Sequence, residues 1–402
     1  MITNIISLVL LVIPPAITSE SSWTSPDIRI VEEWSLNVLD RIEPAYTHLG
    51  TVYGVESENG FEWHTILVDK DYILHFEGNT LIDSISYSGD IWRMTFSPDC
   101  RYLLGYCYND EKLILIDLAE RTVNSNPFFS GSSELPGNPL IRVTNNGTIL
   151  VKHSTYLRMY DSHFSCTLSL DDFSWSGSFI TLSNAGDRFY VEDNYSIYAY
   201  DMQANLLWSI ALPEATEQFP SRSFSLSNTG SMLAVTDFNK LYIYSTDHSD
   251  MLTESTFEDN ISGPEFSESD AFLMVNCFTH PEVTPLRSIH SFGLRSFALQ
   301  NSSIEINSEF HVSRFMTGLT MPYSFSTYMI SDNGFILGFL YYDPDFGRIA
   351  LLSPDMDFIW LSENLFRNRS WSFRFISDKN IRSDNSGFWY YDGESIHSCR
   401  IE

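Results

Sequence analysis

The chain has 402 residues, enough for one large β architecture or for two to three small domains. Aromatic residues make up 15% of it and charged residues only 19%, a composition that argues against disorder and against a coiled coil. The formal net charge of −29 repels phosphate backbones and anionic lipids, so we expect no nucleic-acid partner.

The first 22 residues have the pattern of a signal peptide. An apolar run extends from Ile5 to Ile13 and is followed by two prolines and small polar residues. A membrane-spanning helix needs about 20 apolar residues, so this run is too short to be one. We predict a signal peptide over residues 1–22, with cleavage around Thr18 to Ser22, although no Lys or Arg precedes the run; the alternative is an apolar strand packed on the fold. The expected location is secreted or periplasmic, with no membrane insertion after cleavage.

A repeated unit of short strands follows. Each copy has an apolar strand ending in Ser or Thr, a polar turn, a second apolar strand, another polar turn and a third strand. The last residues of the first turn, taken as anchors, are Gly60, Cys100, Gly147, Gly186, Gly230, Asp270, Gly334 and Asn380. Intervals between anchors run from 39 to 47 residues, with one of 64. A period in the forties with three or four strands per unit is typical of a β-propeller blade.

One such unit cannot bury both of its faces alone, whereas units that stack around a ring shield one another. Glycine at an anchor supplies the positive φ that the turn requires. We therefore predict an all-β fold with a single β-propeller domain over residues 23–402. Its antiparallel blades have four strands each, and the anchors indicate eight blades, with seven as the alternative.

Two irregularities in the repeat carry their own predictions. The long interval before Gly334 predicts an insertion within residues 281–324. The last unit ends with the chain and lacks one outer strand, which residues Arg29 to Leu36 could supply. That pairing would join the two ends of the chain and close the ring.

The turn sequences resemble a known superfamily. FSPDC, from Phe96, and LSNAG, from Leu182, resemble the FSPDG-type hairpin of WD40-like propellers. The stretch Ala199–Trp208 is similar to the quinoprotein-like repeat, and Leu351–Trp360 repeats its register. The resemblance covers nearly all of the mature chain and implies the propeller fold. The Trp-Asp dipeptide of WD40 blades is replaced here by Ile-Asp or Tyr-Asp.

The quinoprotein resemblance also implies a possible quinone-cofactor dehydrogenase. Such enzymes carry adjacent cysteines or a dense pocket with calcium, and adjacent cysteines are missing here. We therefore take the resemblance to support the fold and expect no cofactor. We expect free buried thiols, with a Cys107–Cys166 disulfide as the alternative. The five cysteines are Cys100, Cys107, Cys166, Cys277 and Cys399.

No catalytic constellation is evident, so we predict no catalytic, cofactor-binding or metal-binding residues. The ten histidines form no HExxH pattern, and His64, beside Trp63 in a predicted strand, is expected to be packed or edge-exposed. Four aspartates around one hairpin offer oxygen ligands for a weak calcium site as an alternative, but no DxDxDG run accompanies them. These are Asp343, Asp345, Asp355 and Asp357.

The resulting prediction is an exported, non-catalytic recognition or scaffold protein. It would be a monomer that binds a protein or a carbohydrate through its loop faces, where exposed aromatic residues could stack on sugar or anchor a partner. The alternative is a propeller lyase or glycoside hydrolase with acid and base groups around the central channel.

Overall fold

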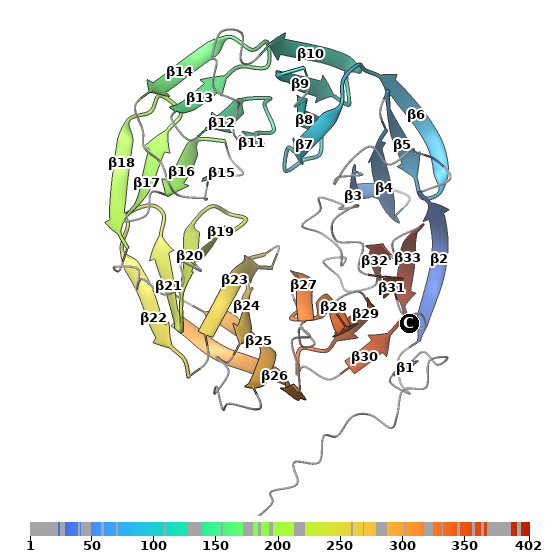
Figure 1. Ribbon diagram of the computed structural model, residues 1–402, viewed down its shortest axis with the longest axis vertical. Coiled ribbons are helices and arrows are strands. Elements are labelled where there is room, and N and C mark those ends of the chain that lie inside the picture. Colours follow the sequence, from blue (N-terminus) through green and yellow to red (C-terminus); the bar gives the residue numbers. More distant parts are fainter. Residues whose placement is uncertain are drawn as a thin grey trace, which may run out of the picture.

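The computed structural model consists of short antiparallel strands arranged around a circle (Figure 1). The described residues are 23–24, 29–38, 41, 50–57, 60–69, 71–107, 110–127, 139–153, 156–171, 180–183, 186–192, 196–212, 222–258, 260–267, 269–278, 288–300, 303–316, 325–331, 333–343, 346–355, 358–362, 366–367, 387–391 and 395–402. The predicted signal peptide over 1–22 lies outside these ranges, as does Asn380. The strands account for all regular structure in the ranges, and no helix there is long and apolar enough to cross a membrane.

The described strands form eight sheets that follow one another in chain order. The first six have four antiparallel strands each, in sequence order from the inside of the circle outward (Figure 1). The first three sheets are β3 (Gly50–Ser57), β4 (Gly60–Val68), β5 (Tyr72–Glu77) and β6 (Thr80–Ser86); β7 (Ile91–Phe96), β8 (Tyr102–Cys107), β9 (Lys112–Asp117) and β10 (Thr122–Pro127); and β11 (Leu140–Val143), β12 (Ile149–Lys152), β13 (Tyr156–Tyr160) and β14 (Cys166–Asp171). The next three are β15 (Ile180–Leu182), β16 (Arg188–Glu192), β17 (Ser196–Asp201) and β18 (Leu206–Ala211); β19 (Ser223–Leu226), β20 (Met232–Asp237), β21 (Lys240–Ser245) and β22 (Met251–Thr256); and β23 (Asn260–Phe266), β24 (Phe272–Phe278), β25 (Ser288–Gln300) and β26 (Ser303–Met316).

The last two sheets depart from four strands. The seventh has β27 (Phe325–Ile330), β28 (Ile336–Asp343), β29 (Phe346–Leu352) and β30 (Phe358–Leu361), with β1 (Trp23–Thr24) paired to β30 and β31 (Phe366–Arg367) paired to β29. The eighth has β32 (Gly387–Tyr391), β33 (Ser395–Ile401) and β2 (Ile30–Asn37).

Strands from both ends of the chain meet in the eighth sheet. Ile30 lies opposite Ile401, and Val31 lies opposite Arg400. The backbone amide of Arg29 also donates a hydrogen bond to the carbonyl of Glu402 at 2.9 Å. The pairing predicted for the segment from Arg29 is therefore present.

Each sheet buries both faces against its neighbours. On one face of the first sheet, Ile66 packs with Leu103 of the second sheet; on the other, Trp63 packs with Trp389 of the eighth. Similar apolar clusters join the second sheet to the third, the third to the fourth, the fourth to the fifth, the fifth to the sixth, and the seventh to the eighth. The sixth and seventh sheets meet where the ring of Phe272 lies beside Gly334.

The anchor turns repeat in atomic detail. Six anchors have φ between 56° and 83°: Cys100, Gly147, Gly186, Gly230, Asp270 and Gly334. In each, the anchor amide donates to the carbonyl of the Ser or Thr three residues earlier, at 2.8 to 3.0 Å. The buried hydroxyl of that Ser or Thr accepts from a backbone amide at the start of the next strand, at 2.9 to 3.2 Å. The predicted need for positive φ is confirmed at these six turns, whereas Gly60 begins β4.

The region predicted to hold an insertion contains a long hairpin. β25 and β26 pair from Gln300 opposite Ser303 to Ser288 opposite Met316. β24 pairs with β25 only as far as Phe292, so the hairpin continues four residues past its sheet within the described part of the chain. Part of the long interval before Gly334 is thus taken up by longer strands.

All five cysteines are free. Cys107, Cys277 and Cys399 are buried, as expected, but Cys100 is half-buried and Cys166 is exposed. Cys166 differs from the expectation because it begins β14, an outer strand with no sheet outside it (Figure 1). The alternative Cys107–Cys166 disulfide is wrong.

Candidate functional site

One cluster of polar side chains lies across the three inner strands of the first sheet. Side chains alternate between the two faces of a strand, so Glu62 and His64 project from the same face of β4. Tyr53 of β3 lies opposite His64, and Glu77 of β5 lies opposite His64 on the other side. His75, two residues before Glu77, shares this face. The sheet register therefore brings five residues from three strands together.

Hydrogen bonds connect the aromatic members of this cluster. His64 Nδ1 and His75 Nε2 are 2.9 Å apart, and the Tyr53 hydroxyl lies 3.2 Å from the same His75 nitrogen. The rings of Tyr53 and His64 are stacked, with their centroids 5.4 Å apart. These contacts fix the orientation of the His64 ring.

Partial burial keeps the cluster's rings uncharged. Burial and, to a smaller extent, the neighbouring His64 lower the pKa of His75 to about 4. Burial also lowers the pKa of His64, and it raises the pKa of Tyr53 to about 12. At neutral pH both imidazoles are therefore neutral and the phenol is protonated.

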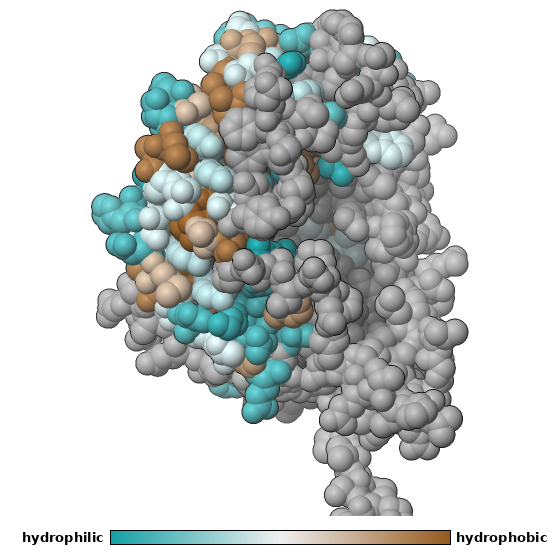
Figure 2. All heavy atoms as spheres, turned by 60° about the vertical axis from the view of Figure 1, so that its left-hand side comes forward, coloured by the Kyte–Doolittle hydropathy of each residue, from teal (hydrophilic) through white to brown (hydrophobic). Residues whose placement is uncertain are grey.

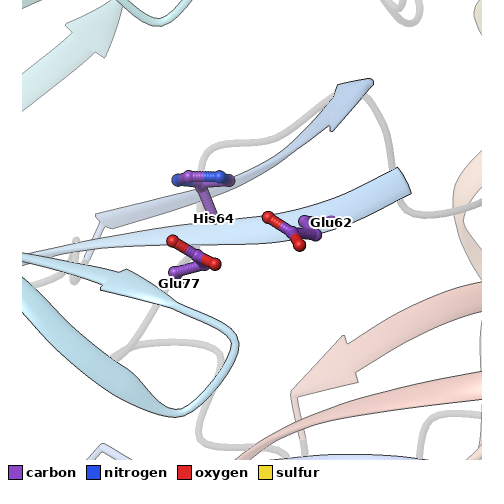
Figure 3. A group of neighbouring side chains, drawn as sticks. All are labelled: Glu62, His64 and Glu77. Atoms are coloured by element: carbon purple, nitrogen blue, oxygen red, sulfur yellow. The ribbon is translucent and has the colours of Figure 1, made fainter. Parts of the chain in front are cut away.

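The carboxylates of the cluster face solvent. Glu62 and Glu77 are exposed, whereas His64 is half-buried. One ligand atom from each of Glu62, His64 and Glu77 lies within 4.8 Å of the other two (Figure 3). These three residues are the group that could hold a metal ion within the described ranges.

The sequence pointed to part of this cluster. Trp63 is packed, as expected, and His64 is half-buried beside it. No metal-binding residue is expected from the sequence, yet the structure brings Glu62, His64 and Glu77 together. The one sequence signal is Glu-x-His in a strand, which places both side chains on one face. The contribution of Glu77 depends on the β4–β5 register, which the sequence does not reveal.

The four aspartates of the alternative calcium site are only partly described. Asp343 ends β28, and Asp355 is exposed in the turn before β30. Asp345 and Asp357 lie outside the described residues. The calcium site therefore stays a prediction.

A second group of charged side chains is buried where the second strands of three successive sheets end. Lys152 ends β12, Glu192 ends β16 and Asp237 ends β20, and all three are at most 9% exposed. Arg222 pairs with Asp237 through Nη2 and Oδ2 at 3.3 Å. Burial lowers the pKa of Lys152, and the negative charge of Glu192 in the next sheet offsets this effect only in part.

Exposed apolar side chains recur at one place in the outer strands. They lie within the first three residues of the strand, beside the turn from the third strand, and are 38% to 53% exposed. We call this set the apolar rim; it consists of Leu81 and Ile82 of β6, Val123 of β10, Leu206 and Leu207 of β18, and Met251 of β22. Figure 2 turns the side with β18 and β22 forward and shows hydrophobic patches among polar ones.

This architecture is that of a β-propeller, and a solved WD40 domain shares the fold. The C-terminal WD40 domain of Sif2 matches 93% of this chain and 98% of its own length, with a TM-score of 0.52 and 10% identity. Hsv2 of Kluyveromyces lactis matches 76% of this chain and 94% of its own, with a TM-score of 0.47 and 12% identity. No family model and no curated protein matches the sequence. At such identities the likeness concerns the fold.

Proposed function

We propose that this protein is a non-catalytic interaction scaffold, built as an eight-bladed propeller whose ring is closed by the pairing of β2 with β33. Each of the eight sheets would be one blade. The β2–β33 register and the apolar cluster between the eighth and first sheets support this closure. A closed ring gives every blade a neighbour on each face and holds the surface loops in fixed positions.

The apolar rim is the observation that carries the proposal. Contiguous exposed apolar surface on a soluble protein often marks an interaction site, and the neighbouring residues Leu81–Ile82 and Leu206–Leu207 extend such surface on two of the strands. Four outer strands present such residues at the same height, so a partner could contact several blades at once. Because the whole chain has a formal net charge of −29, the partner is a protein with both apolar and basic side chains. A glycan is the other ligand that the sequence suggests.

Export is part of the same proposal. The apolar run from Ile5 to Ile13 supports a cleaved signal peptide and a secreted or periplasmic protein that acts as a monomer. Sequencing the amino terminus of the protein purified from its source tests this, because a start between Thr18 and Ser22 is expected. A mature protein that still begins at Met1 would contradict it.

The interaction test compares two exposed apolar sites at opposite ends of the strands. Partners cross-linked to the protein at the surface of its source cells are identified for the wild type, for Leu206→Ser/Leu207→Ser and for Tyr72→Ser. Tyr72 is 49% exposed but begins β5, at the other end from the apolar rim. We expect one partner protein to be lost at least tenfold in the rim variant and retained in Tyr72→Ser. Equal capture by all three, or binding to a glycan array alone, would contradict the proposal.

The buried charged group favours an enzyme as the second candidate. A lyase or glycoside hydrolase needs an acid and a base held at fixed separation, and Glu192 with Lys152 are buried side chains of this kind. Release of products from polysaccharides or peptides by the wild type, abolished in Glu192→Gln, would favour this candidate over the scaffold.

A further inference from the structure

We propose that Glu62, His64 and Glu77 bind one divalent transition-metal ion of the zinc type. Tetrahedral coordination with bonds of 2.0–2.2 Å places neighbouring donor atoms roughly 3.4 Å apart. The three donor atoms here already lie within 4.8 Å of one another. Because both glutamates are exposed, their side chains can close the remaining distance without disturbing packed residues.

The donor set selects the class of metal. Carboxylates and water alone suit calcium and magnesium, whereas an imidazole nitrogen suits zinc, copper, iron and nickel. One imidazole with two carboxylates therefore favours the second class. Three protein ligands leave a fourth position for water.

His75 and Tyr53 hold the His64 ring as an outer layer of the site. A metal-binding histidine commonly bonds through its second nitrogen to another group, which fixes its tautomer and orientation. His64 has such a bond from Nδ1 to His75 at 2.9 Å, so Nε2 is the nitrogen that it offers to a metal ion. Tyr53 in turn contacts His75 at 3.2 Å. His75 is thus a positioning residue.

Charge also favours a cation at this place. Among the described residues, neither Glu62 nor Glu77 is paired with a lysine or arginine. Two carboxylates close together repel each other, and the net charge of −29 adds to that repulsion. A divalent ion neutralises the pair. This inference does not depend on the interaction function.

The test is a titration of the full chain with Zn²⁺ in competition with a chromophoric chelator. We expect one site in the wild type, and at least tenfold weaker binding in Glu62→Gln/Glu77→Gln. The matched control, Glu120→Gln/Asp250→Asn, removes two exposed carboxylates elsewhere and is expected to bind like the wild type. Because all four substituted carboxylates are exposed, both double variants should fold, which a thermal melt verifies.

Two further measurements separate the roles. His75→Phe is expected to weaken Zn²⁺ binding about tenfold and to change the visible absorption of bound Co²⁺, because it frees the His64 ring. Ca²⁺ is expected not to compete with Zn²⁺. Equal Zn²⁺ affinity in the wild type and Glu62→Gln/Glu77→Gln would overturn the site, and Ca²⁺ binding there as tightly as Zn²⁺ would overturn the class of metal.

Discussion

At the scale of single residues, aspartates at the ends of third strands organise the turns that follow. Asp117, Asp161 and Asp201 each accept backbone hydrogen bonds from the next few residues through Oδ1. These are the Ile-Asp and Tyr-Asp positions that stand where WD40 blades have Trp-Asp. A short carboxylate that caps turn amides explains the aspartate in all three, whatever residue precedes it.

Asp117 also forms the best-defined ion pair of the second sheet. Its Oδ2 accepts from Arg101 Nη2 at 2.8 Å, and its side chain is only 10% exposed. Burial acts to raise the pKa of Asp117, but the hydrogen bonds from Arg101 and the turn amides outweigh it and lower the pKa below its usual value. The folded state therefore favours the ionised carboxylate, and the unfolded state binds the proton more readily.

We predict that Asp117→Asn loses stability in a pH-dependent way. At pH 7 the variant should be less stable by about 1–3 kcal/mol, the usual worth of hydrogen bonds to a charged group. The stabilisation by Asp117 is complete above its unfolded pKa of about 4 and is lost as the pH falls through the lower folded value. The difference between wild type and variant should thus shrink below pH 4, as measured by urea unfolding from pH 7 to pH 3.

Asp250→Asn is the control for this prediction, because Asp250 is exposed beside β22. At each pH in the same range, Asp250→Asn should have the same unfolding midpoint as the wild type. A difference between Asp117→Asn and wild type that stays constant down to pH 3 would contradict the titration of Asp117 as its cause.

At the scale of elements, the anchor turns of neighbouring sheets are connected to each other. Asp270, the sixth-sheet anchor, is buried and accepts from the amides of Asn228 and Thr229 at 2.7 and 2.9 Å. It also accepts from the Thr229 hydroxyl at 2.6 Å. These bonds reach the fifth-sheet turn, so Asp270 contributes to the contact between sheets although its φ of 61° would suit glycine.

We predict that Asp270→Gly destabilises the protein although it removes backbone strain. Three hydrogen bonds between sheets are lost, at a cost of about 1–3 kcal/mol, against a gain of about 1 kcal/mol from the relaxed turn. The control is Cys100→Gly, which also replaces a non-glycine anchor by glycine, at the second-sheet turn, where φ is 56°. Chemical denaturation should show a lower midpoint for Asp270→Gly and an equal or higher one for Cys100→Gly. An unchanged midpoint in Asp270→Gly would refute the contribution of the Asp270 hydrogen bonds between the two sheets.

At the scale of the whole molecule, the sequence predicts what depends on local pattern. The anchor turns follow from residues adjacent in the chain, so Gly147, Gly186 and Gly230 could be placed correctly. Features that depend on the register between strands could not be placed from the sequence. A shift of one residue in the pairing moves every side chain of a strand to the other face of the sheet. The cluster of Glu62, His64 and Glu77 belongs to this second kind.

The outer strands show the same limit. Leu and Met also occur in the buried strands, so residue type does not distinguish the outer strands. Leu206 and Met251 are exposed because their strands lie at the outside of the circle (Figure 1). The expectation that Cys166 is buried is wrong for the same reason. Position at the outer edge of a sheet, and not hydropathy, decides exposure here.

Closure of the ring by the two chain ends can be tested with a cysteine that the chain already has. Glu32 of β2 lies directly opposite Cys399 of β33. Opposite residues in antiparallel strands have Cα atoms about 4.5–5.5 Å apart, within the range of disulfides. We predict that Glu32→Cys forms a disulfide with Cys399 during oxidative refolding, since burial raises the pKa of the folded Cys399 thiol to about 12 and leaves little thiolate.

The expected disulfide encloses most of the chain, so it should stabilise the oxidised protein by about 5 kcal/mol over its reduced form. Peptide mapping identifies the bond, and denaturation with and without reductant measures its effect. Glu33→Cys is the matched control, because Glu33 sits in the bulge between Glu32 and Trp34 and has no opposite residue in β33. If both variants or neither formed the bond with Cys399, the β2–β33 register, and with it the closure of the propeller by its two ends, would be wrong.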